Sequence, residues 1–393
     1  MQKEIKIILI DPMCQVPFYD FYLLNELSNQ NVKVKFFTRE PTFIKNYFRN
    51  HNFKLFHLTK ISQTIFKEHR IGKFFKYFEL LFFDFPKIFF HSFTSKIIHI
   101  QWFSKTPILF FEFHFYKFLQ KTFHKKLVFT AHNIFPHERN SQNFFHLKKI
   151  YSAFDKIIVM SNYSQKKLID EFKIENSKIE IIPHGPLFYD FPTIEIEVAR
   201  QKIGIEKNKF VVLFQGFFRK YKGVEFLLNT FSIFVKKYPN AILLLIGSGK
   251  DGYIFEIQNM IDYLKIPREN ILQEFSFVSL EKISLYYNAS NVCVLPYQHI
   301  YQSGVLATAM SFKKPIVVTS VGNFSEIIEN NVNGKLIEYG NINQFQNALE
   351  EIYLNQNIQM ELGKNAYKTI TENYSWNLIA EKTKHIYEKL YNE

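Results

Sequence analysis

The chain has 393 residues, of which 47% are hydrophobic, so it is too long for one ordinary core and fits two domains of roughly 150 to 200 residues. Its two cysteines, Cys14 and Cys293, lie far apart and outside any Cys/His cluster, which excludes a disulfide framework and a zinc site. The formal net charge is +13, and no apolar run approaches the roughly 18 residues of a membrane-spanning helix, which excludes an integral membrane protein.

The first segment, MQKEIKIILIDPMC, has an apolar run too short for a signal peptide, so we interpret it as a strand of a cytoplasmic protein with buried, reduced thiols. Beyond it, short apolar runs alternate with segments of helical period, which indicates parallel βα units. Strands are expected at residues 5–10, 32–37, 97–102, 126–131, 156–160 and 178–183, and then at 210–215, 241–247, 292–297, 315–320 and 334–339.

The fold class is therefore α/β, with two doubly wound parallel sheets. Glycine and prolines interrupt the pattern at residues 184–201, where we expect the hinge. This gives an N-terminal domain at 1–185, a C-terminal domain at 186–372, and a last helix at 373–393 that can cross back to the N-terminal domain. Ligands bind beyond the carboxyl ends of parallel strands, so the cleft between two such sheets is the expected site.

Charge and phenylalanine are unevenly divided along the chain. Residues 1–185 carry 28 Lys and Arg against 15 Asp and Glu, whereas residues 186–393 carry 21 of each. The first half also holds 31 of the 46 phenylalanines, as in KFFKYFELLFFDFPKIFFHSF at 73–93. Aromatic side chains interleaved with lysine are typical of a membrane interface, so we expect this half to associate with an anionic membrane surface. Genomic nucleotide bias and core packing are the alternative explanation of the phenylalanines, and no zinc-finger or RNA-recognition pattern supports nucleic acid.

The segment YQSGVLATAM, residues 301–310, follows the strand-like run NVCVLPY and opens a small-residue helix. Ser303 is expected at the N-cap, with Gly304 and Val305 in the first turn. Free N–H groups and the helix dipole make such a turn a phosphate site, provided that it faces the cleft. An ordinary capped turn without a ligand explains the same residues.

A second loop, FQGFFRKYKG at residues 214–223, also follows a strand and precedes a helix. It carries Arg219 and Lys222 beside Gly216 and Gly223. Two cations here match the charge of a diphosphate, the arginine by paired hydrogen bonds and the lysine as a point charge. The alternative is that both are solvated loop charges.

These motifs occur in a recognisable order. GFFRKYKG, LLLIGSG (243–249), LPY, QSGV, PIVVTSVGNFSEII (315–328) and NGKLIE (333–338) resemble the donor half of retaining glycosyltransferases of family 4. In the first half, KLVFTAHNIFPHE (126–138) is similar to the acceptor-side loop of that family. The resemblance covers nearly the whole chain and implies the GT-B fold, two Rossmann-like domains facing a central cleft, and a retaining hexosyltransferase.

The resemblance also assigns roles by position. It implies that Arg219 and Lys222 hold the donor diphosphate and that His132 lies near the transferred sugar, which makes these three the catalytic candidates. A structural role for His132 at the end of a strand is the alternative, and His99 and His184 are interpreted as structural. The other donor-side candidates are Gly216, Gln302, Ser303, Gly304, Val305, Thr308, Gly322 and Glu326. On the acceptor side the candidates are His137, Glu138, Tyr19 and Asp20.

Two features depart from the family pattern. The family commonly has two glutamates eight positions apart, where this chain has Ile300 and Thr308, so the identity of the sugar stays open. The QSGV turn is similar to that of a subgroup of the family. The usual glycine-rich turn after the first strand is replaced by DPMCQVPFYDF at 11–21, which is why Tyr19 and Asp20 are acceptor candidates.

The chemistry follows from the charge that must be stabilised. Cleavage of the bond between the anomeric carbon and the phosphate leaves an oxocarbenium-like sugar and a charged nucleoside diphosphate, so fixed cations and N–H dipoles at that phosphate lower the barrier. No Asp-x-Asp motif is present, and neither a metal nor another cofactor is expected. The resemblance implies retention of configuration, with the departing phosphate taking the acceptor's proton.

The leading hypothesis is a transferase that moves a sugar from a nucleoside-diphosphate donor to a lipid-linked or surface-polysaccharide acceptor, at the inner face of the membrane. A sugar-nucleotide epimerase of the same fold is one alternative. A non-catalytic, membrane-associated partner subunit is another, because the glutamate pair is missing. A nicotinamide oxidoreductase is disfavoured, since no Gly-x-Gly-x-x-Gly follows the first strand. UDP, GDP and ADP all stay open as the nucleotide.

Overall fold

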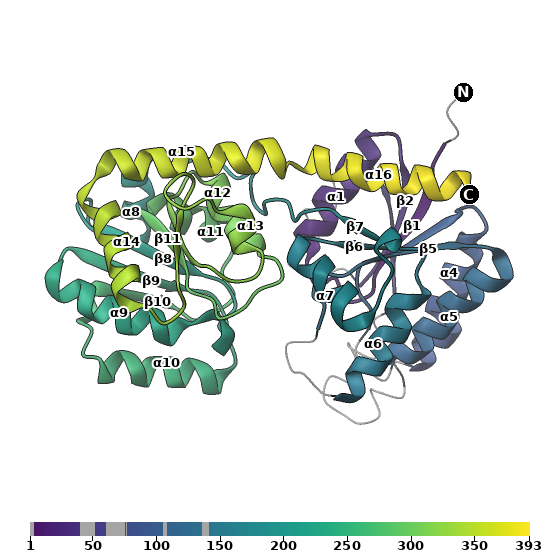
Figure 1. Cartoon of the computed structure of the whole chain (residues 1–393), viewed down its shortest axis with the longest axis horizontal. Coiled ribbons are helices and arrows are strands. Elements are labelled where there is room, and N and C mark those ends of the chain that lie inside the picture. Colours follow the sequence, from purple (N-terminus) through teal and green to yellow (C-terminus); the bar gives the residue numbers. More distant parts are fainter. Residues whose placement is uncertain (1–3, 40–51, 60–74, 76, 105–107, 136–140) are drawn as a thin grey trace. The chain divides into compact units, whose positions relative to one another are not determined.

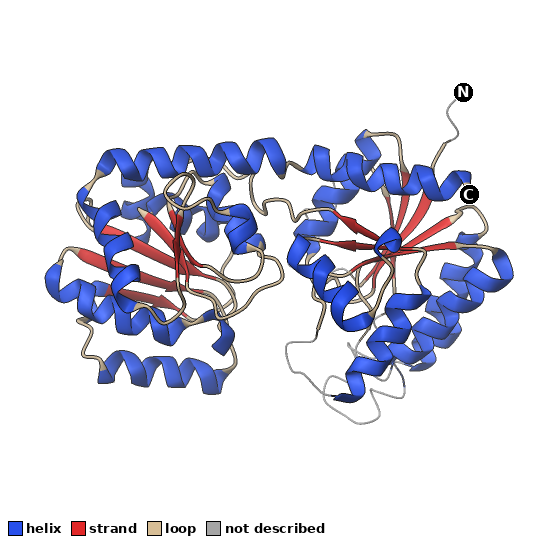
Figure 2. Ribbon diagram, in the orientation of Figure 1, coloured by secondary structure: helices blue, strands red, loops and turns tan. Residues whose placement is uncertain are grey.

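The computed structural model describes residues 4–39, 52–59, 75, 77–104, 108–135 and 141–393. The chain forms two compact units, which we call the N-terminal unit (1–183 and 376–393) and the C-terminal unit (184–375). Each unit is a parallel β-sheet with helices on both faces (Figures 1 and 2). The α/β class and the two doubly wound sheets expected from the sequence are confirmed.

The N-terminal unit contains a seven-stranded sheet of order β3-β2-β1-β4-β5-β6-β7. Its central strands are almost wholly apolar because helices cover both faces of a parallel sheet. The strands are β1 (Lys6–Asp11), β2 (Lys33–Thr38), β3 (Lys54–His57), β4 (Ile97–Ile100), β5 (Lys126–Thr130), β6 (Lys156–Val159) and β7 (Ile179–Ile181). The helices are α1 (Pro17–Asn29), η3 (Leu80–Asp84), α4 (Phe85–Ser92), α5 (Ile108–Phe123), α6 (Ser141–Ala153), α7 (Asn162–Phe172), η4 (Asn176–Lys178) and α16 (Trp376–Asn392).

The C-terminal unit contains a six-stranded sheet of order β10-β9-β8-β11-β12-β13. The expected hinge segment 184–201 ends in a helix, because α8 begins at Ile196. The strands are β8 (Phe210–Gln215), β9 (Ala241–Ile246), β10 (Ile271–Glu274), β11 (Val292–Leu295), β12 (Ile316–Thr319) and β13 (Lys335–Ile337). The helices are α8 (Ile196–Ile203), η5 (Lys220–Lys222), α9 (Val224–Lys237), α10 (Asp251–Tyr263), η6 (Arg268–Asn270), α11 (Leu280–Ala289), α12 (Gly304–Ser311), α13 (Phe324–Ile327), α14 (Ile342–Leu354) and α15 (Gln356–Asn373).

Two expectations from composition concern the thiols and the membrane. Both Cys14 and Cys293 are buried, as expected, and burial raises the pKa of Cys293 to about 12, so this thiol stays protonated. Across the described ranges, no helix combines the length and the apolarity that crossing a lipid bilayer needs.

The last helix, α16, is part of the N-terminal unit, where it packs on α1 and β4 (Figure 1). Trp376 contacts the rings of Tyr19 and Tyr22 with centroids 5.0 and 5.6 Å apart. Further along, the Tyr387 hydroxyl lies 2.6 Å from His99 Nδ1, inside the core. The break expected at 373–376 lies between α15 and α16.

Replacing Tyr387 with phenylalanine should lower the free energy of unfolding by about 1–3 kcal/mol, because a buried ring nitrogen of His99 loses its hydrogen-bond partner. His99 Nε2 would keep its contact with Thr130 Oγ1, at 2.7 Å, so the ring stays in place. Urea unfolding measures the change. Tyr263→Phe, at a side chain that is 83% exposed, is the matched control and should change nothing.

Candidate active site

The turn between β11 and α12 is built as the sequence predicts. Ser303 is the N-cap of α12, and its Oγ accepts a hydrogen bond from the Leu306 N–H at 3.1 Å. Gly304 and Val305 form the first turn and are half-buried. Their amide groups lie at the positive end of the helix dipole, where an anion is stabilised.

The loop after β8 lies against the loop after β11. The Tyr221 carbonyl accepts the Gln298 N–H at 2.7 Å, which ties the two loops together. Gly223 has φ +66°, and a Cβ at this position would meet the Pro296 carbonyl oxygen at 1.9 Å. Only glycine allows this approach. The two loops singled out in the sequence are therefore neighbours at the carboxyl edge of the same sheet.

Lys222 points its ammonium group towards the start of α12. A Cβ built on Gly216 would lie 2.7 Å from Lys222 Nζ and 3.6 Å from Val305 Cγ2. The ammonium and the Val305 side chain thus both lie against the open side of Gly216, where a larger residue would carry its Cβ. The Lys222 Nζ also lies 5.2 Å from the ring centroid of Tyr297. Lys222, Gly216 and Val305 are therefore brought together.

The surroundings of Lys222 destabilise the charged form of its side chain. Burial, and then the charge of the nearby Arg219 guanidinium, lower the pKa of Lys222 from 10.5 to about 7. Arg219 itself is exposed, with its guanidinium carbon 5.1 Å from the ring centroid of Phe217. A buried lysine next to a second cation is stabilised in its charged form when an anion arrives.

We expect binding of a nucleoside diphosphate to take up about one proton per site at pH 8, because the anion restores the charge on Lys222, whose pKa is about 7 without it. Affinity should therefore fall as the pH rises above 7. Calorimetric titration with UDP in two buffers of different ionisation enthalpy measures the uptake. Lys222→Met should abolish it, whereas Lys220→Met, at an exposed lysine paired with Glu256, should not. Uptake that persists in Lys222→Met would assign the proton to another group.

The same pKa shift has a stability consequence of known sign. The folded pKa of Lys222 is lower than the unfolded value, so the unfolded chain binds more protons between about pH 7 and pH 10.5. In this interval the contribution of Lys222 to stability therefore rises with pH.

His184 is a residue of this site that the sequence did not reveal. A Cβ on Gly304 would lie 3.0 Å from His184 Cε1, so the imidazole covers the start of α12. Burial lowers its pKa to about 4, which keeps the ring neutral, and its Nδ1 donates to the Gly185 carbonyl at 2.6 Å, which orients the ring. A structural role for His184, expected from the sequence, is compatible with this position beside the donor turn. Its position in HGP, at the end of a strand and before the hinge, was the available signal.

Thr308 is buried, and its hydroxyl forms hydrogen bonds with backbone groups of Gly304 and Leu187. Its Oγ1 donates to the Gly304 carbonyl at 2.7 Å and accepts the Leu187 N–H at 3.2 Å. These bonds fasten the segment after β7 to α12. Thr308, at one of the two glutamate positions of the family pattern that the resemblance implies, thus has a hydroxyl engaged with backbone groups.

The remaining donor-side candidates surround the loop between residues 298 and 303. Ile300 is buried, and a Cβ on Gly322 would meet its carbonyl oxygen at 1.8 Å, which requires glycine at φ +52°. The side-chain oxygen of Gln302 is buried without a hydrogen-bond partner among the described residues. Glu326, on α13, is exposed. Gly322 thus packs against the 298–303 loop, of which Gln302 is a part, whereas the Glu326 side chain is exposed to solvent.

In the N-terminal unit, His132 follows β5 in a buried aromatic setting. Its ring stacks on Trp102 with centroids 4.8 Å apart and meets the edge of Tyr19 at 4.8 Å. Its Nε2 lies 2.8 Å from Gln101 Oε1, and because a carboxamide oxygen only accepts, Nε2 carries the hydrogen. Two of the sequence candidates, His132 and Tyr19, are thus in contact.

Asp20 forms a buried carboxyl pair with Asp11, which the sequence analysis did not single out. Asp11 accepts the N–H groups of Met13 and Gln15 at 3.0 and 2.9 Å. Burial, and then the charge of Asp11, raise the pKa of Asp20 well above its ordinary value. Asp20 is therefore the protonated member of the pair, and its carboxyl O–H donates a hydrogen bond to Asp11. His137 and Glu138 lie outside the described residues.

Two family models match the chain one after the other. The model described as Glycosyltransferase Family 4 matches residues 21–185, and the model described as Glycosyl transferases group 1 matches residues 195–369. The two models together cover most of the chain, which therefore belongs to the glycosyltransferases that they describe. The GT-B fold expected from the sequence is confirmed by the two parallel sheets and the structural neighbours. The likeness to family 4 read from the sequence is thereby confirmed, and the subgroup with a QSGV turn stays a prediction.

Individual relatives of this glycosyltransferase are distant. The alpha-monoglucosyldiacylglycerol synthase of Acholeplasma laidlawii is 26% identical over 61% of this chain and 60% of its own length. The capsular polysaccharide biosynthesis glycosyltransferase CapM of Staphylococcus aureus is 25% identical over 60% of this chain and 62% of its own length. The chain spans about three fifths of the length of the curated relatives it matches. The crystal structure of Anabaena HepE with UDP-glucose has a TM-score of 0.76 at 15% identity, covering 98% of this chain and 99% of that one, which shows the fold.

Proposed function

We propose that this protein is a retaining hexosyltransferase that uses a nucleoside-diphosphate sugar. One observation carries the proposal: the Lys222 ammonium lies over Gly216 beside the first turn of the capped helix α12. A buried ammonium, an exposed guanidinium at Arg219 and free amides at a helix N-terminus complement a diphosphate. UDP is the favoured nucleotide, since the HepE structures contain UDP or UDP-glucose.

In the proposed reaction the bond between the anomeric carbon and the phosphate oxygen breaks, and both of its electrons leave with the nucleoside diphosphate. Lys222, Arg219 and the amides of Gly304 and Val305 stabilise the charge that develops on that phosphate. The acceptor hydroxyl attacks from the face of the leaving group, its oxygen bonds to the anomeric carbon, and its proton passes to the departing phosphate oxygen. Configuration is retained and no enzyme carboxylate acts as nucleophile.

The other assignments complete this proposal. His132 is proposed to contact the transferred sugar, and Tyr19 and Asp20 to lie on the acceptor side. With two cations and the helix amides at the diphosphate, we propose that no metal is used.

The acceptor is proposed to be lipid-linked or a surface polysaccharide, and the site of action the cytoplasmic face of the membrane. The excess of basic residues in 1–185 supports an anionic surface as partner. Two relatives support these acceptor classes: an alpha-monoglucosyldiacylglycerol synthase is consistent with a lipid acceptor, and a capsular polysaccharide biosynthesis glycosyltransferase with a polysaccharide.

Thermal unfolding with UDP-, GDP- and ADP-sugars tests the donor assignment, because a ligand that binds the folded state raises the apparent melting temperature. We expect a rise with UDP-sugars and slow release of UDP by the isolated chain. No shift with any of the three, at concentrations that saturate a related enzyme, would refute the proposal.

A non-catalytic partner subunit is the second candidate, favoured by one observation: Thr308 and Ile300 supply no carboxylate at the two positions where the resemblance to family 4 implies glutamates. Such a subunit would bind UDP without releasing it from a UDP-sugar. A same-fold epimerase would instead return an isomerised donor when no acceptor is present. Chromatography of the donor after incubation separates the three outcomes.

A further inference from the structure

Exposed apolar side chains of the N-terminal unit are concentrated on two neighbouring segments. Within its described residues, every exposed large hydrophobic side chain lies on residues 75–93, which include η3 and α4, or on α5. We call their exposed surface the phenylalanine face. The most exposed rings are Phe90 at 69%, Phe82 at 62% and Phe93 at 54%.

The two segments pack on one another, and their exposed rings lie in groups. Beneath the exposed rings, the buried Phe85 and the half-buried Phe115 stack with centroids 4.1 Å apart and join α4 to α5. At the surface, Phe93 contacts Phe123 at 5.4 Å, and Phe123 contacts Phe118 at 5.7 Å. On the first segment, Phe78 contacts Phe82 at 4.5 Å and Phe83 at 6.1 Å. The exposed rings of the two segments thus gather in groups instead of lying singly, and exposed aromatic groups of this kind mark an interaction surface.

The charges of the two segments are sorted between inside and outside. The acidic residues of 75–93 and 108–123 are Glu79, Asp84 and Glu112, and all three are buried. The exposed polar side chains include His114 and Lys121 on α5. The phenylalanine face therefore offers aromatic rings and the Lys121 ammonium to a partner, and every carboxylate of these two segments is buried. This combination fits the interface of an anionic lipid bilayer.

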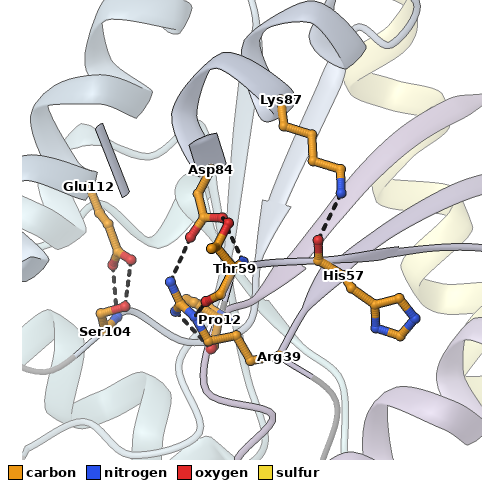
Figure 3. A network of polar contacts seen from close by, with 8 residues as sticks. All are labelled: Pro12, Arg39, His57, Thr59, Asp84, Lys87, Ser104 and Glu112. Atoms are coloured by element: carbon orange, nitrogen blue, oxygen red, sulfur yellow. Dashed lines mark hydrogen bonds and ion pairs between the residues drawn. The ribbon is translucent and has the colours of Figure 1, made fainter. Parts of the chain in front are cut away.

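The buried carboxylates hold the segments to the carboxyl edge of the sheet (Figure 3). Asp84 binds the Arg39 guanidinium at 2.6 Å and the Thr59 N–H at 2.9 Å. Arg39 follows β2 and Thr59 follows β3.

A second attachment fastens α5, since Glu112 accepts the Ser104 N–H at 2.7 Å and its Oγ–H at 2.6 Å (Figure 3). Ser104 lies a few residues after β4. Arg39 also donates to the Pro12 carbonyl at 3.2 Å, just beyond β1. The side of the segments opposite to the phenylalanine face is thus fixed to the loops that follow four consecutive strands of the sheet order.

We propose that the phenylalanine face docks on a bilayer containing anionic lipid, and that the Asp84 and Glu112 attachments hold the carboxyl edge of β1–β4 next to that bilayer. This inference rests on the proposed function, because it identifies the acceptor as one carried by the lipid surface. The rings enter the acyl boundary while the cations meet the headgroups. An acceptor anchored in the same leaflet then reaches the strand ends without leaving the membrane.

The test uses the full chain and vesicles of phosphatidylcholine mixed with phosphatidylglycerol. The double variant Phe82→Ser/Phe90→Ser should reduce the partition constant for binding to these vesicles by about tenfold or more, because two aromatic rings no longer transfer from water into the bilayer interface. The matched control is Phe255→Ser/Phe277→Ser, which removes rings that are 63% and 62% exposed in the C-terminal unit. The control should bind vesicles as the unchanged chain does.

Three results would overturn the docking proposal: no vesicle binding by the unchanged chain, equal binding by Phe82→Ser/Phe90→Ser, or equal loss in the control. Sedimentation without lipid identifies the other occupant, since a dimer that the Phe82/Phe90 variant dissociates would make the face a contact between copies. The UDP-dependent thermal shift is measured on every variant and should be unchanged. Vesicle binding without that shift would count against the donor assignment and leave the docking surface standing.

Discussion

Replacing Lys222 with methionine should lower the turnover number by about 100- to 1,000-fold, the usual cost of removing one fixed group that stabilises transition-state charge. The ammonium lies next to Gly216 and Val305, where the proposal places the leaving diphosphate. UDP release from a UDP-sugar measures the change. The fold should survive, since burial already disfavours the charged form of this side chain and methionine fills similar space.

Lys220→Met provides the comparison from the same short helical turn. The Lys220 side chain is 71% exposed and its ammonium pairs with Glu256 at 3.0 Å, so the variant loses only a surface ion pair. Its turnover should stay within about twofold of the unchanged chain. If the two lysine variants behave alike, the diphosphate is not held by Lys222.

Replacing Arg39 with methionine should lower the free energy of unfolding by about 3–5 kcal/mol, because it leaves the buried Asp84 carboxylate without its cation. Burial already raises the pKa of Asp84, and loss of Arg39 removes the charge that opposes this rise. The deficit should therefore shrink as the pH is lowered, since protonation discharges the unpaired carboxylate. Urea unfolding at several pH values measures both effects.

The double variant Arg39→Met/Asp84→Asn separates the charge from the packing. An asparagine in place of Asp84 carries no charge, and its carbonyl oxygen can still accept the Thr59 N–H. Stability should recover by at least half of the loss. A double variant as unstable as Arg39→Met would mean that the aliphatic contacts of Arg39, and not the ion pair, hold the segment.

Much of the fold can be predicted from the sequence, because central parallel strands are recognisable as continuous apolar runs. β1, β8 and β9 are continuous apolar runs, buried on both faces, and they were found within one or two residues. β3 and β10 were missed. Both are edge strands with half-exposed residues, as in KLFH and ILQE, so they lack the apolar run that marks a buried strand.

The capped turn of the donor site was predictable from the sequence, whereas the burial of the side chains around it was not. An N-cap serine before a small-residue helix is a local signal, and Ser303 caps α12 as expected. The burial of Lys222, by contrast, depends on contacts among β8, β11 and α12, which no local pattern encodes. The same holds for His184 over Gly304 and for the shared proton of Asp11 and Asp20, each formed by residues brought together only by the fold.

The chain order of α16 bears on how the protein is made. Residues 184–375 emerge from the ribosome between the first part of the N-terminal unit and the helix that completes it. At a typical synthesis rate this interval is roughly 10–40 s. Throughout it, the α1 surface that receives Trp376 is uncovered on the nascent chain. The C-terminal unit, though synthesised later, is free to finish folding first, so chaperones would meet the aromatic N-terminal half in its unfinished state.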